Sequence, residues 1–387
     1  MPASKNLNND HALAIYIHWP YCERICPYCD FNVYRHRAVD MAVWQQSYLR
    51  ELQYLNELVP GRRVQSIYFG GGTPSLMAPE VVATLIEFIG SQWSLDADAE
   101  ISLEANPTDA ESQRFRAFKS AGVNRLSLGV QALNDEDLKK LGRWHTADEA
   151  RQAFFQARDA FDNVSIDLIY ARPQQSADAW GQELATALAM NPDHLSLYQL
   201  TIEPGTAFER NQNRGTIVLP DDNEAVRLYQ LSQEICDASG FYGYEVSNHA
   251  RAGFESRHNL SYWRYGDYAG IGPGAHGRLS VDGVKYATIS WRDPARWLEQ
   301  IARHGRGVEQ MTAISRDDQA AELVLMGFRL DEGVSLSRYR DVAGVPFDEI
   351  RLGELEQDGF ITVTQTRVRA TGKGRTVLNA VIGRLIA

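Results

Sequence analysis

From residue 13 to residue 200 the chain alternates between short runs typical of β-strands and longer stretches with helical periodicity. The strand-like runs cover residues 13–18, 64–69, 100–106, 124–131, 163–170 and 194–200. An amphipathic segment such as "MAVWQQSYLRELQYLNEL" separates each run from the next. Strands that alternate with helices pair in parallel through crossover connections. The pattern therefore predicts an α/β fold with six strand-helix units.

Within five of these runs, apolar residues alternate with small or polar ones. The apolar set is Ile15, Ile17, Ile67, Phe69, Ile101, Leu103, Leu126, Leu128, Val164, Ile166 and Leu168. The other set is Tyr16, His18, Ser66, Gly70, Ser102, Glu104, Ser127, Gly129, Gln131, Ser165 and Asp167. Parallel strands with both faces covered are usually apolar throughout, so we expect the second set to line a cavity near the carboxyl ends of the strands. A sheet with one wet face is the alternative.

The strand-helix rhythm ends near residue 300. Residues 301–387 read as helices followed by the strand-like "FITVTQTRVRA", which predicts a smaller, winged-helix-like domain after a first domain of residues 1–300. The final stretch carries five basic residues and no acidic ones. Arg367, Arg369, Lys373 and Arg375 either meet a membrane surface or an acidic partner, or form an ordinary solvated wing.

Composition narrows the classes of protein to consider. The 387 residues carry a net charge of -11, so nucleic acid is not an expected partner. No apolar run approaches the roughly 18 residues that cross a bilayer. The amino terminus lacks the features of an export signal, and only about a dozen polar residues precede the first strand. We therefore expect a cytoplasmic protein with reduced thiols.

Three of the four cysteines follow the first strand directly, in the stretch "CERICPYCDF". Iron-sulfur clusters usually have four thiolate ligands, and structural zinc has four nitrogen or sulfur ligands. Cys22, Cys26 and Cys29 leave the fourth position empty, which favours a cluster with one open iron. A zinc site completed by His18, without redox chemistry, and a disulfide remain alternatives. Cys236 lies in a helical segment and is expected to be a small buried residue.

The stretch "YIHWPYCERICPYCDF" resembles the cluster loop of radical S-adenosylmethionine (radical SAM) proteins, with the same C-x3-C-x2-C spacing. The resemblance implies a partial (β/α)6 barrel and a [4Fe-4S] cluster held by Cys22, Cys26 and Cys29. It also implies that the amino and carboxylate groups of S-adenosylmethionine chelate the open iron. An electron donor protein would then supply one electron, which cleaves the sulfonium to a 5'-deoxyadenosyl radical.

The same resemblance suggests residues for the cofactor pocket. "GGGTPS", residues 70–75, is similar to the glycine motif that contacts the methionine moiety, which implicates Gly71, Gly72 and Thr73. Glu104 resembles the acid that binds the ribose, and Tyr16 matches a tyrosine that contacts the cofactor. A plain turn between a strand and a helix would also explain the glycines.

Further motifs resemble the branch of oxygen-independent coproporphyrinogen oxidases and their haem-chaperone relatives. They are "LEANP", "GVQ", "LGRWH" and "SIDLIYARP". By position in these motifs, Gln131, Arg143 and Asp167 correspond to additional contacts of S-adenosylmethionine. Each of the three residues could instead be structural, because buried Arg-Asp pairs are common.

Two features favour the haem-chaperone side of this branch. Phe31 stands where the decarboxylating oxidases have a fourth cysteine, and the long amino-terminal arm of those oxidases is not expected. "HNLSYW", beginning at His258, resembles a signature of the chaperones, which bind haem and pass it to an acceptor protein. We expect residues 257–277 to form a binding loop with His258 as the haem contact and His276 as a second candidate. The alternative is an enzyme that oxidatively decarboxylates coproporphyrinogen III.

Overall fold

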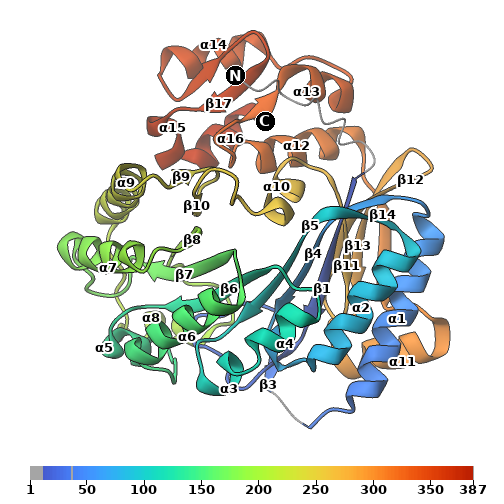
Figure 1. Cartoon of the computed structure of the whole chain (residues 1–387). Coiled ribbons are helices and arrows are strands. Elements are labelled where there is room, and N and C mark those ends of the chain that lie inside the picture. Colours follow the sequence, from blue (N-terminus) through green and yellow to red (C-terminus); the bar gives the residue numbers. More distant parts are fainter. Residues whose placement is uncertain (1–11, 36–37, 387) are drawn as a thin grey trace.

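A computed structural model describes residues 12–35 and 38–386 (Figure 1). Six parallel strands form the centre of its large sheet, and they are the six that the sequence predicts. They are β1 (Ala12–Trp19), β4 (Arg63–Gly71), β5 (Ser94–Ala105), β6 (Arg125–Gln131), β7 (Val164–Tyr170) and β8 (His194–Gln199). Each strand pairs in parallel with the next one in this order. The α/β fold with a partial (β/α)6 barrel is therefore confirmed.

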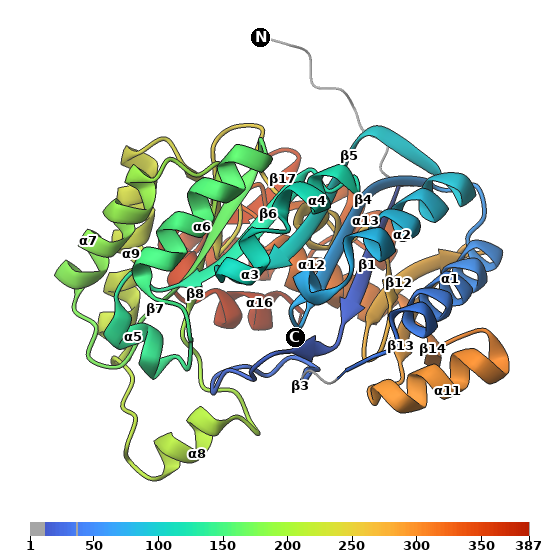
Figure 2. The same cartoon turned by 60° about the horizontal axis from the view of Figure 1, so that its bottom comes forward.

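Helices follow the parallel strands along the chain, and the longer ones cover one face of the sheet (Figures 1 and 2). The longer ones are α1 (Met41–Leu58), α2 (Pro79–Gln92), α6 (Ala147–Ala160), α7 (Ala177–Ala189) and α9 (Asp222–Ala238). Shorter ones are η1 (Pro74–Leu76), α3 (Asp109–Ser112), α4 (Phe115–Ser120), α5 (Asp135–Lys140) and α8 (Ala207–Asn213). Local signals fix their starts, since Asp40 caps α1 and Thr146 with Glu149 forms a capping box on α6.

The two faces of the parallel strands differ as the alternating pattern predicts. Every residue of the apolar set named in the sequence analysis is buried within the main hydrophobic core. Burying such side chains stabilises the fold by about 1.5–3 kcal/mol each. The opposite face carries Tyr68, Glu104, Ser127 and Asp167, and these side chains line a cavity. The strand pattern thus forces the polar residues onto one inner surface.

Additional strands extend the sheet at both edges, which the sequence reading did not anticipate. β11 (Asp267–Ile271) pairs in parallel with β1, and β12 (His276–Val281), β13 (Val284–Ser290) and β14 (Val308–Ala313) follow antiparallel. At the other edge, β10 (Asn248–Ala250) pairs with β8 and with β9 (Tyr242–Gly243). α11 (Pro294–His304) packs against α1.

The prediction that residues 257–277 form a loop is therefore wrong. This stretch folds into helix α10 (Arg257–Trp263), strand β11 and the start of β12. Ser256 caps α10 by accepting from the backbone of Asn259. β11 supplies the hydrogen-bonding partner that the edge of β1 would otherwise lack, and this pairing explains why the segment is extended.

The carboxyl-terminal part packs around a core of its own. It consists of α12 (Arg316–Gly327), β15 (Val334–Ser335), α13 (Leu336–Ala343), α14 (Glu349–Gln357), β16 (Ile361–Val363), β17 (Arg367–Ala370), α15 (Gly372–Thr376) and α16 (Leu378–Ile386). Its strands form a separate sheet in the order β15-β17-β16. Figure 1 places these elements beside α9 and α10, at the opposite end of the molecule from β3 (Tyr34–Arg35). The boundary at residue 300 stays a prediction.

Acidic side chains pair with much of the basic stretch near the carboxyl terminus. Arg367 bonds Glu332 at 3.0 Å, and Arg375 bonds Asp331 at 3.2 Å. These pairs offset the positive charge on which the predicted membrane or partner contact depends. Across residues 12–35 and 38–386, no helix combines the length and apolar character needed to cross a bilayer. The expectation about an amino-terminal arm concerns residues 1–11, which lie outside the described residues.

Candidate functional site

A cavity of about 470 Å³ opens at the carboxyl ends of the parallel strands. Its lining includes all but two of the residues that the sequence assigned to cluster and cofactor binding. Those that line it are Cys22, Cys26, Cys29, Gly71, Gly72, Thr73, Glu104, Gln131, Arg143 and Asp167. The two others, Tyr16 and His258, lie elsewhere. The structure thus brings together side chains that are up to 145 positions apart in the sequence, from Cys22 to Asp167.

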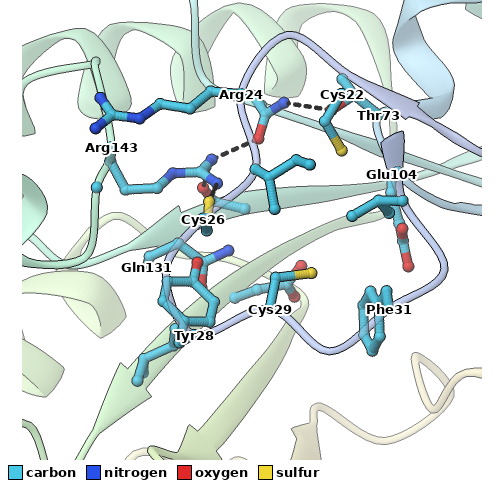
Figure 3. Close-up of a pocket in the computed structure, with 18 of the residues that line it drawn as sticks. Cys22, Arg24, Cys26, Tyr28, Cys29, Phe31, Thr73, Glu104, Gln131 and Arg143 are labelled. Carbon is cyan, nitrogen blue, oxygen red and sulfur yellow. Dashed lines mark hydrogen bonds between the residues drawn. The ribbon is translucent and has the colours of Figure 1, made fainter. Parts of the chain in front are cut away.

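The three cysteines lie on one loop above the strand ends (Figure 3). The short strands β2 (Tyr21–Cys22) and β3 pair and hold the two ends of this loop together. All three are free thiols, so the disulfide alternative finds no support. Burial is the main cause that raises the pKa of Cys22 to about 12 and that of Cys29 to about 11.

Groups beside the cysteines oppose the effect of burial. The Thr73 hydroxyl lowers the pKa of Cys22, and the backbone N–H of Phe31 lowers the pKa of Cys29. The Arg143 guanidinium donates to the Cys26 sulfur at 3.4 Å. Donors of this kind favour the thiolate form that binds metal.

The surroundings of His18 do not favour the zinc alternative. His18, the expected fourth zinc ligand, has both ring nitrogens engaged, at 3.0 Å from the Tyr16 hydroxyl and 3.0 Å from the Asn32 carbonyl oxygen. The loop residues therefore suit a cluster held by three cysteines.

The glycine turn after β4 packs directly under the cysteine loop. The Gly72 N–H donates to the Trp19 carbonyl oxygen at 2.7 Å, and the Thr73 N–H donates to that of Tyr21 at 2.9 Å. A Cβ atom on Gly72 would lie 2.5 Å from the Tyr21 carbonyl oxygen. A side chain at residue 72 would thus push the turn away from the loop.

Glu104 points into the cavity from the end of β5. It accepts hydrogen bonds from the Tyr68 hydroxyl at 2.8 Å and from the Gly71 N–H at 3.2 Å. Burial raises the pKa of Glu104 to about 7, and the negative charge of Asp167 adds to this rise. Each oxygen keeps a lone pair for a further donor, which is what binding a pair of ribose hydroxyls requires.

Gln131 ends β6 with a left-handed backbone, at φ 68°. Such a conformation is unfavourable for a residue with a side chain and tends to occur at binding sites. The pairing register between β6 and β7 shifts at the same point, between Leu128 and Gln131. Gln131 borders the cavity at this irregular point of the strand.

Sequence reasoning missed a residue that links several of these side chains. The amide of Asn106 donates to the Thr73 hydroxyl at 3.0 Å and accepts from the Arg143 guanidinium. The buried Glu111 accepts in turn from the Asn106 backbone at 2.7 Å. Figure 3 shows the bonds that join Thr73, Arg143 and Cys26. The only signal for Asn106 was its place in "LEANP", immediately after an inward-facing strand.

The predicted haem contact is not part of the cavity lining. His258 lies on α10, only 5% exposed, with its ring stacked on Tyr68 at 4.9 Å and its Nδ1 3.1 Å from the Ser66 hydroxyl. Burial lowers the pKa of His258 to about 3. Tyr16 packs in the same region, at 6.3 Å from the His258 ring. The assignment of His258 to haem and that of Tyr16 to S-adenosylmethionine stay predictions.

His276, the second candidate, is differently placed. It begins β12 and is exposed. It follows the glycine loop whose Pro273 carbonyl oxygen accepts from Asn32 of the cysteine loop. His276 therefore lies accessible at the same edge of the sheet as the cluster loop.

Comparisons with known proteins agree with this geometry. Residues 16–184 match the radical SAM superfamily, and residues 314–377 match the HemN C-terminal domain. "Heme chaperone HemW" of Escherichia coli is 37% identical over 97% of this chain and 98% of its own. "Radical S-adenosyl methionine domain-containing protein 1, mitochondrial" of Bos taurus is 38% identical, over 97% of this chain and 87% of its own.

A solved structure supports the fold over nearly the whole chain. Coproporphyrinogen III oxidase (HemN) of Escherichia coli, described as a radical SAM enzyme, matches 98% of this chain and 91% of its own, with a TM-score of 0.81 and 22% identity. At that identity the match establishes the architecture alone. Together with the cysteine loop and the two matched families, the full-length relatives show that the chain belongs to the radical SAM superfamily, in the HemN-like branch that includes the proteins named HemW.

Proposed function

We propose that this protein is a haem chaperone that holds a [4Fe-4S] cluster and S-adenosylmethionine, binds haem and transfers it to an acceptor protein in the cytoplasm. The observation that carries the proposal is the match at 37% identity to a protein named heme chaperone HemW, over almost the full length of both chains. Radical SAM membership itself implies the cluster and S-adenosylmethionine.

In this proposal Cys22, Cys26 and Cys29 hold the cluster at the mouth of the cavity. When bound, the cluster supplies one-electron reduction to the sulfonium of the cofactor. The chain's own contribution is to position the cofactor and to exclude water. Glu104 accepts from the ribose hydroxyls, and the glycine turn at residues 71–73 offers backbone groups to the methionine moiety. Gln131, Arg143 and Asp167 complete the proposed cofactor contacts that line the cavity, and Tyr16 stays a predicted contact outside that lining.

Two histidines are candidates for the haem iron. The lowered pKa of His258 keeps its imidazole neutral at pH 7, the form that coordinates iron, but coordination would require α10 to move away from Tyr68. His276 needs no such movement because it is exposed. Partial desolvation by its neighbours and the positive charges of Arg278 and Arg292 also lower the pKa of His276, so its ring too is available as a neutral ligand.

The alternative activity is oxidative decarboxylation of coproporphyrinogen III. Phe31 argues against this activity, because it stands at the position of the fourth cysteine of those oxidases. The Phe31 side chain borders the cavity and is 62% exposed. An exposed aromatic ring at the mouth suits contact with a flat macrocycle and cannot provide thiol chemistry.

One anaerobic experiment separates these functions. The reconstituted protein is titrated with haem while the Soret band is followed, and a parallel sample receives coproporphyrinogen III, S-adenosylmethionine and dithionite. Haem binding without protoporphyrinogen formation supports the chaperone, and turnover of coproporphyrinogen overturns it. His258→Ala and His276→Ala are titrated alongside. The variant that loses the Soret shift identifies the axial ligand, and unchanged binding in both rejects both histidines.

A further inference from the structure

Arg143 reaches the cysteine loop from the segment between α5 and α6, and its guanidinium makes three bonds at once. One terminal nitrogen donates to the Cys26 sulfur at 3.4 Å. The other donates to the Gly129 carbonyl oxygen at 3.0 Å and to the Asn106 side-chain oxygen. The planar group is therefore fixed in one orientation, with one edge toward a cysteine and the other toward the ends of β5 and β6.

We propose that Arg143 raises the reduction potential of the cluster through its bond to Cys26, and that Asn106, held by Glu111, positions Arg143 for this role. The inference rests on the proposed cluster. It goes beyond that proposal because it states that Arg143 and Asn106 set the potential at which the cluster accepts an electron.

The charge of Arg143 distinguishes Cys26 from the other two cysteines. Among the hydrogen bonds of the described residues, the bond from Arg143 to Cys26 is the one in which a cation donates to a cysteine of the loop. Reduction of the cluster takes up one electron from the reductant and breaks no bond, so the reduced state carries one more negative charge. A cation in contact with a ligand sulfur stabilises that state more than the oxidised one, which raises the potential.

Arg143 remains charged in this setting. A guanidinium is not deprotonated in folded proteins, so Arg143 places a permanent positive charge beside the Cys26 sulfur. The contribution to the potential therefore persists across the pH range in which the protein is folded.

Asn106 connects the cation to a rigid frame. Its side chain joins Arg143 to the Thr73 hydroxyl. Glu111 anchors Asn106 by accepting from its backbone N–H at 2.7 Å and from its amide at 3.3 Å. Loss of the Asn106 side chain removes the bond that holds Arg143 against the loop while the cation itself remains.

The test is an anaerobic redox titration of the reconstituted protein, with the signal of the reduced cluster followed by electron paramagnetic resonance. We expect Arg143→Gln to shift the midpoint potential to a more negative value. Arg143→Lys should give an intermediate value, because one ammonium nitrogen cannot serve all three acceptors. Asn106→Ala should shift the potential in the same direction as Arg143→Gln. Iron and sulfide content and thermal unfolding are measured for each variant.

Arg24→Gln is the matched control. Arg24 also borders the cavity, where it lies over the Trp144 ring at 5.4 Å, so its removal deletes the same charge near the loop. The midpoint potential of Arg24→Gln should shift by less than that of Arg143→Gln.

The outcomes separate the inference from the proposed function. A wild-type protein without a paramagnetic signal after reduction overturns the cluster itself. A wild-type signal with equal potentials in wild type, Arg143→Gln and Asn106→Ala overturns only the role of Arg143. An equal shift in Arg24→Gln and Arg143→Gln also overturns it, because a general effect of charge would then suffice. If Arg143→Gln does not fold, Arg143→Lys and Asn106→Ala decide the question.

Discussion

The side-chain amide of Asn32 donates to the carbonyl oxygen of Pro273 at 3.0 Å. The same amide donates to the Arg292 carbonyl oxygen at 2.9 Å, and the Asn32 carbonyl oxygen lies 3.0 Å from a ring nitrogen of His18. Asn32 comes three positions after Cys29. One residue thus fastens the end of the cysteine loop to β1 and to the glycine loop after β11, so the strands at the sheet edge support the proposed cluster site.

This contact predicts that Gly274 is essential for the loop. A Cβ atom on Gly274 would lie 2.3 Å from the Asn32 amide nitrogen, and the residue has φ 77°. Gly274→Ala should displace Asn32 and reduce the iron and sulfide that the chain retains after reconstitution. Gly283 is the control, since it has φ 79° but nothing lies within 4 Å of a Cβ atom there. Both variants carry a backbone cost of about 1 kcal/mol, and only Gly274→Ala should lose the cluster. Equal cluster content in both would contradict the anchoring role.

The residues that face the cavity from the strands could be predicted from the sequence, because side chains alternate between the two faces of a strand and this alternation is a local signal. Ile15 and Tyr16 alternate sides whatever the rest of the chain does, and the same holds for Leu103 and Glu104. Asn32 and Pro273 are 241 positions apart, and no local pattern connects them. The motif around His258 indicated a role by resemblance, yet the place of its ring depends on how α10 packs against β4.

Glu51 on α1 gives a prediction for stability against pH. It is 1% exposed and accepts from the N–H groups of Gly272 at 2.8 Å and Gly307 at 3.0 Å, and from the Trp297 ring at 3.2 Å. Burial raises the pKa of Glu51 from 4.5 to about 7. Between these values the folded chain keeps a proton that the unfolded chain releases. Stability is therefore greater below pH 4.5 and falls as the pH rises toward 7, by about 3 kcal/mol for this group.

Glu51→Gln should remove that part of the pH dependence. The uncharged amide must also turn an NH₂ group toward N–H donors, which should lower stability by about 1–3 kcal/mol at every pH. Thermal unfolding between pH 5 and pH 8 measures both effects. Glu57→Gln, on the exposed side of the same helix, should leave the profile of the wild type unchanged. A wild-type slope that survives in Glu51→Gln would assign the titration to another group.

Glu104 gives a prediction for cofactor affinity. Its raised pKa, about 7, means that the carboxylate that accepts from ribose hydroxyls becomes fully populated only above neutral pH. Binding of S-adenosylmethionine to the reconstituted protein should therefore tighten from pH 6 to pH 8. Glu104→Gln should weaken binding by about tenfold or more at pH 8 and remove this dependence, as measured by anaerobic calorimetry.

Glu203→Gln is the control for Glu104. Glu203 also borders the cavity, but it accepts from the Thr201 hydroxyl and not from the glycine turn. Its substitution should leave both the affinity and the pH profile close to those of the wild type. A matching loss in both variants would indicate a general effect of charge on the cationic sulfonium.

Substitution of Arg367 tests whether the basic stretch stabilises the carboxyl-terminal part or contacts a membrane or partner. Its guanidinium donates to the carbonyl oxygens of Glu332 at 2.7 Å and Gly333 at 2.9 Å, in addition to its ion pair with the Glu332 carboxylate. Arg367→Gln removes these bonds and should lower the stability of the carboxyl-terminal part by about 1–2 kcal/mol, as followed by thermal unfolding. Arg340→Gln, at an exposed position of α13, should change stability by less than about 0.5 kcal/mol.

The basic residues of this stretch also allow a test of whether the protein contacts a membrane surface. Because Arg367 and Arg375 are paired with acids of this chain, the wild type should not sediment with vesicles that contain anionic lipid at physiological salt. Neutralising Arg367, Arg369, Lys373 and Arg375 together should then change nothing in that assay. Vesicle binding by the wild type that disappears in the fourfold variant would show instead that the internal pairs open and that this surface contacts the bilayer.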